Sequence, residues 1–277
     1  MVLFNIKTMR IKHFYLPALL ISICTYSAIA QKSSSKQTAD KNSSDWFIKP
    51  VFKKGEMLGN IYSRAIAYSG DDFKDLVQRV SGSSTYKVLD DDYLKPVFNE
   101  TDVYDGRPAT NTTITVEPSG KVSFNNQTMM NSSASGLMYS ELVWGKLPAK
   151  IHEGDSWKIN IGQPWELGGP GEQTVTVMQV DAAHHTIMLK REGSSEGYYD
   201  YDAKQISITT KDGKSVKMDM APGTSHWIGY TIFKNGIVIS DELLVTRPIT
   251  LTAEGLKFDG KEREYILLNA MPVDDKQ

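Results

Sequence analysis

The stretch Trp144–Ile161, WGKLPAKIHEGDSWKINI, decides how the rest of the sequence is interpreted. Pro148 disfavours a helical conformation at Leu147, and Gly154 followed by Asp155 is typical of a turn. After this turn, apolar residues at 157, 159 and 161 alternate with polar residues at 156, 158 and 160, the period of a half-buried strand. The stretch therefore predicts a stiff connector that leads through a tight turn into a strand.

Strand-like segments lie on both sides of this connector, separated by turn sequences rich in Gly, Pro, Asn and Asp. The expected strands cover residues 59–68, 85–89, 95–104, 110–116, 121–125, 156–161, 173–180, 186–192, 205–210, 215–220, 226–233 and 237–251. Such a run of hairpins predicts a mainly β protein with an antiparallel sheet. Because the sheet must hide one apolar face, we expect strong curvature, as an open barrel or a two-layer sandwich.

Helical patterns are scarce, and one or two short helices are expected. The best candidate is Asp71–Val80, which has acidic residues in its first turn and Phe73, Leu76, Val77 and Val80 at helical spacing. Gly82 is typical of a helix stop.

Residues 1–30 have the pattern of a signal peptide. A positively charged start precedes the apolar run Phe14–Ile23, and Ala28-Ile29-Ala30 fits the cleavage pattern, so the mature chain is expected to begin at Gln31. Cys24 invites a lipoprotein interpretation, but a bulky isoleucine precedes it. Residues 31–45 then form a flexible polar leader, and residues 46–277 a single β-rich domain.

The mature chain is acidic and lacks cysteine. Removal of residues 1–30 takes away three basic residues and no acid, so 28 bases face 33 acids and the formal charge is −5. This balance argues against nucleic acid as a partner, and no transmembrane segment is expected in the mature chain. Export without disulfides fits the bacterial envelope, periplasmic or extracellular. The sequence does not predict the oligomeric state.

No residue pattern predicts catalysis, a metal site or a cofactor. His184 and His185 lie in a polar connection without further ligands at metal-site spacing, and the acids at 90–92 lack the spacing of a calcium loop. The residues at 152–155 coincide with the expected turn, and Ser194 and Ser195 lack a nucleophile elbow. A paired-carboxylate glycosidase stays open, because its acids come from separate strands.

Aromatic side chains are the better candidates for ligand binding. Trp165, Trp227, Tyr198 and Tyr199 supply flat rings suited to a sugar platform or to an apolar groove. Trp165 lies in a Gly/Pro-rich loop, where a core role is harder to arrange, and is expected to form a lid or binding tip.

Turn chemistry predicts strand register. We expect three-residue hairpin loops at 118–120, 211–213 and 234–236, each ending in Gly. The first hairpin is then expected to pair Glu117–Lys121, Val116–Val122 and Ile114–Phe124. The second is expected to pair Ile208–Val216 and Ile206–Met218, and the third Phe233–Ile237, Thr231–Ile239 and Trp227–Leu243. A two-residue Asn235-Gly236 loop, with Ile232 opposite Ile239, is the alternative for the third hairpin. The bulged register places Asp241 and Arg247 on an otherwise apolar face, as candidates to bind a polar ligand group.

The connector with Leu147-Pro148 and Gly154-Asp155-Ser156-Trp157, together with the later pattern Gly229-x-x-x-Phe233-x-x-Gly236, resembles exported bacterial β-rich proteins of unknown function with a LolA-like, lipoprotein-carrier-like fold. The resemblance implies a curved antiparallel sheet whose apolar concave face holds acyl chains in the carriers. It brings no catalytic residues.

The sequence therefore predicts an exported, non-enzymatic β protein that binds an apolar or amphipathic ligand such as a lipid. Two alternatives stay open: a protein that binds or processes glycans, and a structural or partner-binding module of the envelope.

Overall fold

The computed structural model describes residues 49–92, 96–104, 108–116, 122–124, 127–129, 138–139, 141–161, 170–196 and 204–273. The expected signal peptide and polar leader lie outside these residues.

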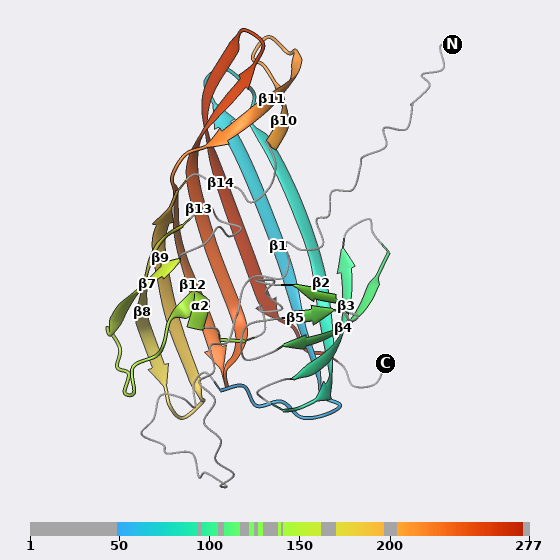
Figure 1. Ribbon diagram of the computed structural model, residues 1–277, viewed down its shortest axis with the longest axis vertical. Coiled ribbons are helices and arrows are strands. Elements are labelled where there is room, and N and C mark those ends of the chain that lie inside the picture. Colours follow the sequence, from blue (N-terminus) through green and yellow to red (C-terminus); the bar gives the residue numbers. More distant parts are fainter. Residues whose placement is uncertain are drawn as a thin grey trace.

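In this part of the chain, fourteen strands form one antiparallel sheet (Figure 1). Their bounds are β1 Met57–Gly70, β2 Leu76–Asp90, β3 Val97–Tyr104, β4 Thr110–Val116, β5 Val122–Phe124, β6 Gln127–Met129, β7 Ser156–Ile161, β8 Gly171–Asp181, β9 Thr186–Ser195, β10 Lys204–Thr209, β11 Ser215–Pro222, β12 Ser225–Lys234, β13 Ile237–Ala253 and β14 Leu256–Ala270. Twelve of them follow the order β6-β5-β4-β3-β2-β1-β14-β13-β12-β9-β8-β7, and the hairpin β10–β11 attaches through β11 to β13.

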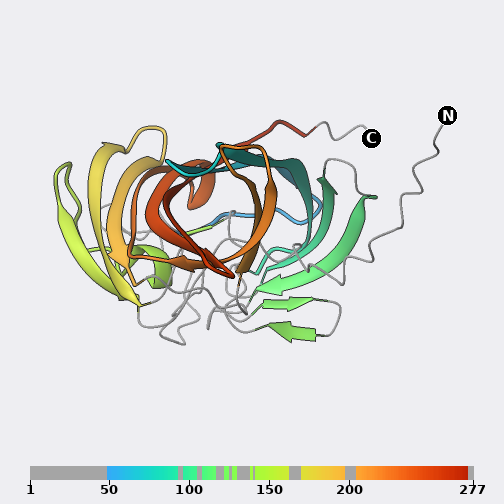
Figure 2. The same cartoon turned by 90° about the horizontal axis from the view of Figure 1, so that it is seen from above.

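The mainly β, hairpin-built fold is confirmed, but the expected open barrel or two-layer sandwich is wrong. The sheet is neither closed nor strongly curled, and the described strands all belong to it. Figure 2 shows β7 and β8 at one side of the molecule and β3 to β6 at the other. The chain hides one face with its own short segments, so this face needs no second sheet.

That face is here called the covered face, and the side chains that point to it are every second residue along each strand. In β12 the odd-numbered residues from Ser225 to Phe233 are buried, and in β13 the odd-numbered residues from Leu243 to Leu251. In β14 the buried positions are the even ones from Glu262 to Leu268. The opposite face, called the open face, carries exposed side chains such as Ile228, Leu244 and Tyr265.

Four apolar clusters cover this face. The edge cluster joins Val175, Val177, Ile187, Leu189 and Phe233 to Tyr139, Val143, Trp144 and Leu147. A second cluster packs Phe52 and Met138 on β2 to β4, and a third packs Ile206 and Ile208 of β10 on Tyr68 and Leu251. Between them lies the central cluster, which consists of Tyr62, Trp227, Leu243, Val245 and Ile266.

Two of the three predicted hairpin registers are confirmed. Ile114 pairs with Phe124 and Val116 with Val122, whereas Glu117 and the loop at 118–120 lie outside the described residues. Ile206 pairs with Met218 and Ile208 with Val216. Gly213 has a φ of 91°, as the left-handed position of this loop requires.

The third register is wrong. Lys234 pairs with Ile237, so the loop is the two-residue Asn235-Gly236 turn, with φ values of 51° and 74°. A bulge between Ile232 and Phe233 then shifts the ladder by one residue, which sets Thr231 opposite Asp241 and Trp227 opposite Val245. The turn therefore has the two-residue loop that the sequence offered as the alternative. The bulge then brings the odd-numbered residues of β13 back to the covered face, where the three-residue loop would have placed them.

The expected helix at 71–80 is also wrong, because Leu76–Asp90 is a strand between β1 and β3. The helix that the structure describes is α2, the four residues Glu141–Trp144. No helix among the described residues has both the length and the apolar character to cross a membrane. The strand β14, at the centre of the sheet, was not expected from the sequence.

The connector behaves as its sequence predicts. Gly154 has a φ of 91°, and the Asp155 carboxylate accepts a hydrogen bond from the backbone N–H of His152 at 2.8 Å. In β7, exposed and half-buried residues alternate from Ser156 to Ile161. The expected turn and strand are thus both confirmed.

Candidate functional site

Half of the candidate ligand-binding residues can be placed. Trp165, Tyr198 and Tyr199 lie outside the described residues, whereas Trp227, Asp241 and Arg247 lie on the covered face. Each of the three contacts polar side chains from other strands.

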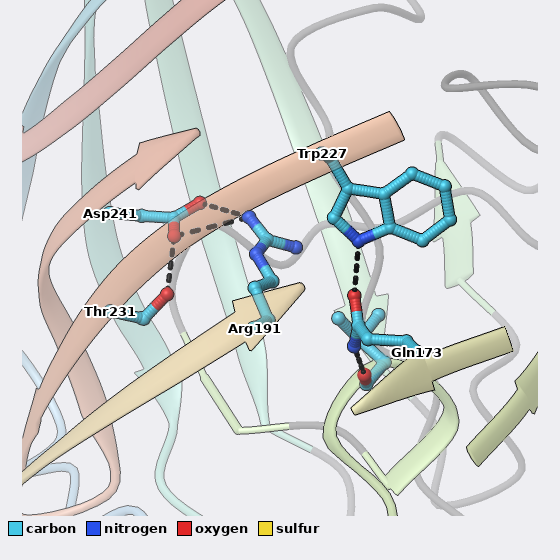
Figure 3. A network of polar contacts seen from close by, with 6 residues as sticks. Gln173, Arg191, Trp227, Thr231 and Asp241 are labelled. Carbon is cyan, nitrogen blue, oxygen red and sulfur yellow. Dashed lines mark hydrogen bonds and ion pairs between the residues drawn. The ribbon is translucent and has the colours of Figure 1, made fainter. Parts of the chain in front are cut away.

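Asp241 is held by two side chains from adjacent strands (Figure 3). One Arg191 nitrogen, Nη2, donates to both Asp241 carboxylate oxygens, at 3.1 and 2.9 Å, and the Thr231 hydroxyl donates to Oδ1. The Arg191 guanidinium also lies over the Trp144 ring, 4.8 Å from its centroid. The ion pair is nearly buried, so it neutralises both charges within the protein.

Trp227 is a packed indole with a fixed polar edge. Its Nε1 donates to Gln173 Oε1 at 2.8 Å, and Gln173 Nε2 donates to the Val143 carbonyl at 2.6 Å (Figure 3). The ring lies over Gly193, where an added Cβ would come within 2.6 Å of it. With 4% of its surface exposed, Trp227 is not a platform on which a sugar can stack from solvent.

The same carbonyl end of α2 is tied down at two further points. Trp157 Nε1 donates to the Trp144 carbonyl and the Tyr139 hydroxyl to the Gly145 carbonyl, each at 2.6 Å. Three side chains thus satisfy the carbonyls that a helix end leaves free. They fix α2 as a cover over the edge cluster.

Arg247 belongs to a buried cluster of four charges. It pairs with Glu262 at 3.1 Å and with Glu264 at 3.3 Å, and Glu264 also pairs with Arg64. Two arginines and two glutamates leave the cluster neutral. Burial, with Glu262 and Glu264 adding to it, raises the pKa of the nearby Tyr68.

Two buried serines stand out beside these paired groups. Ser195 of β9 and Ser225 of β12 lie directly opposite each other, with 3% and 0% of their surfaces exposed. Neither hydroxyl has a hydrogen-bond partner among the described residues. Sequence reasoning missed them, since only the strand register shows that both point to the covered face next to Trp227.

A separate acidic pair lies on β3. Burial, with a smaller contribution from Asp102, raises the pKa of Glu100 to about 7, although a hydrogen bond with Tyr86 opposes the shift. Burial also raises the pKa of Asp102, whose carboxylate accepts a hydrogen bond from the Ser84 hydroxyl at 2.5 Å. The protonation of Glu100 is therefore expected to change near neutral pH.

His152 and His184 take turn positions. His184 bonds Asp181 within its own turn, at 2.7 Å, and His152 lies 3.5 Å from Asp155. Across the described ranges, no group of three His, Cys, Asp or Glu residues could hold a metal ion.

A comparison with protein-family models finds no matching family, and a comparison with curated proteins finds no match either.

Proposed function

We propose that the protein is an exported, non-enzymatic component of the bacterial envelope that binds an amphipathic ligand on the covered face of its sheet. The observation that carries the proposal is the pair of buried hydroxyls, Ser195 and Ser225, which lie beside the central cluster and have no hydrogen-bond partner in the described part of the chain. A buried hydroxyl without a partner costs about 1–3 kcal/mol. A bound group that hydrogen-bonds to both serines would recover this free energy.

The surroundings of the two serines define the chemistry of the ligand. Trp227 lies two residues along β12 from Ser225 and pairs with Val245, so apolar surface adjoins the hydroxyls. An acyl chain or another apolar group suits this surface, as the resemblance to lipoprotein carriers also implies.

The polar part of the ligand is expected to be neutral. Arg191 is paired with Asp241, and Arg247 with Glu262 and Glu264, so these cations are already neutralised. A carboxylate or phosphate would have to break a buried ion pair, which is costly. An ester, amide or hydroxyl group needs only the two serine hydroxyls. Because both are buried, the ligand reaches them only after the covering side chains move.

The test is a binding titration with N-phenyl-1-naphthylamine, a neutral apolar fluorophore with one N–H donor. We expect saturable binding, and Ser195→Ala with Ser225→Ala should weaken it about five- to tenfold, the value of roughly one hydrogen bond. The same double variant should unfold at a higher urea concentration than the wild type, because it removes two unsatisfied buried groups.

Ser63→Ala, on the open face, is the matched control and should change neither quantity. Equal affinity of the wild type and the double variant would contradict the role of the two serines. Absence of probe binding would contradict the proposed function itself.

A further inference from the structure

The open face carries an apolar row across four neighbouring strands. Ile228 of β12 pairs with Leu244 of β13, Leu244 with Tyr265 of β14, and Tyr265 with Ala65 of β1. Ile228, Leu244 and Tyr265 expose 37%, 41% and 37% of their surfaces. A sheet face in water normally carries polar residues at such positions, so a continuous row indicates an interaction surface.

The strand next to the row presents small, uncharged side chains. On β1 the open-face positions after Ile61 are Ser63, Ala65, Ala67 and Ser69. Small side chains in line let another surface approach the backbone closely. No large side chain therefore protrudes from β1 between Ser63 and Ser69, which lets a second sheet face pack close to it.

Charges of opposite sign flank the row at equal distances. Glu242 lies two residues from Leu244 on one side and accepts a hydrogen bond from the Tyr265 hydroxyl at 2.8 Å. Arg263 lies two residues from Tyr265 on the other side, opposite Thr246. Both side chains are exposed. On β13 and β14, the open face is thus acidic on one side of Leu244 and Tyr265 and basic on the other.

We propose that a second copy of this chain packs on the open face, about a two-fold axis that runs along the apolar row. This axis reverses the strand direction of the partner, so that the apolar row of one copy packs on the apolar row of the other. Glu242 of each copy then faces Thr246 of the other, whose strand neighbour is Arg263. The contacts of Glu242 and Arg263 are self-complementary in charge, as a two-fold interface requires. The inference does not depend on the ligand proposed for the covered face.

Sedimentation equilibrium of the chain that begins at Gln31 tests the inference. We expect a monomer–dimer equilibrium in the micromolar range. Glu242→Arg and Arg263→Glu should each weaken the dimer about tenfold or more, because each places like charges across the axis. The double reversal Glu242→Arg with Arg263→Glu should bring the dissociation constant back to within about threefold of the wild type.

Lys217→Glu is the control for Arg263→Glu, because it makes the same change of charge on an exposed residue of β11. It should leave the dimer unchanged, and circular dichroism should show that every variant is folded. A monomer at every concentration up to about 500 µM would overturn the inference. So would a double reversal that fails to recover, or flotation of the wild type with phosphatidylglycerol vesicles through this face in place of dimerisation.

Discussion

At the scale of single residues, the covered face combines apolar packing with charges that other charges neutralise. Arg247 is 1% exposed and contacts Glu262 and Glu264, and Arg191 contacts Asp241. Burying such groups is tolerable only while each has its partner, because an uncompensated buried charge costs far more than a broken surface pair. The placement of Asp241 and Arg247 on this face follows from strand parity. Their role in ligand binding stays a prediction, and the neutral ligand proposed for this face does not require it.

Removing one member of the four-charge cluster should be strongly destabilising. Arg247→Met leaves Glu262 buried without its guanidinium, and we expect a loss of about 3–5 kcal/mol in the free energy of unfolding. The combination Arg247→Met with Glu262→Gln should recover a large part of this loss, because it removes the orphaned charge. Urea denaturation measures both. Lys261→Met, exposed on the same strand as Glu262, is the control and should change stability little; a similar small effect of Arg247→Met would contradict the account.

Glu100 should make stability depend on pH. Its pKa rises from 4.5 to about 7 on folding, so the folded protein binds the proton more tightly than the unfolded chain. The resulting stabilisation is complete below about pH 4.5 and is lost as the pH rises through about 7. We expect the free energy of unfolding to fall by on the order of 3 kcal/mol between pH 4.5 and pH 8.

Urea denaturation at several pH values checks this expectation. Glu100→Gln cannot titrate and should show a clearly smaller fall over the same range. Glu254→Gln, at the exposed turn between β13 and β14, should keep the fall of the wild type. Identical pH profiles of the wild type and Glu100→Gln would show that this carboxyl is not the group responsible.

At the scale of elements, the sequence predicts most strands but misses those whose pattern depends on distant residues. In β14 the inward positions 262 and 264 are glutamates, so the strand lacks the apolar alternation expected of a half-buried strand. The arginines at 64 and 247, far away in sequence, make these positions acceptable by pairing with the glutamates.

The false helix at 71–80 has a related cause. Its apolar spacing fits a helix locally, but β1 and β3 offer backbone partners along the whole length of Leu76–Asp90. Tertiary pairing overrides a weak local preference. The two serines of the candidate site could not be predicted for the same reason. The sequence around a single serine in a strand indicates neither the sheet face to which it points nor the residue that pairs with it on the next strand.

The bulge in the β12–β13 hairpin gives an element-scale prediction. Ile239 is the extra residue, because Phe233 pairs with Val238 and Ile232 with Ser240. Deletion of Ile239 should keep every other pair and cost only about 1–2 kcal/mol. Deletion of Leu244 should instead turn the following residues to the wrong face and prevent folding. Circular dichroism and thermal unfolding compare the two deletions, and equal damage would contradict the assigned register.

At the scale of the whole molecule, one open sheet presents two different faces. The covered face holds the two buried serine hydroxyls and the neutralised charges, and the open face holds the apolar row. A ligand and a second copy would therefore use opposite sides of the sheet and would not compete.

Export gives a further whole-molecule prediction. We expect the mature product to begin at Gln31 and to carry no acyl chain, because the residues at 28–30 fit signal-peptide cleavage and Ile23 does not fit a lipidation signal. Intact-mass measurement of the protein from its own envelope checks this. A product that retains Cys24 with an added lipid would contradict it.

The most direct test of the proposed function is native mass spectrometry of the protein isolated from its own envelope fraction. We expect a bound species that is lost on organic extraction and that proves to be a neutral amphipathic lipid. We also expect much lower occupancy in the variant with Ser195→Ala and Ser225→Ala. A ligand-free mass, or a bound glycan whose occupancy is the same in both proteins, would contradict the account.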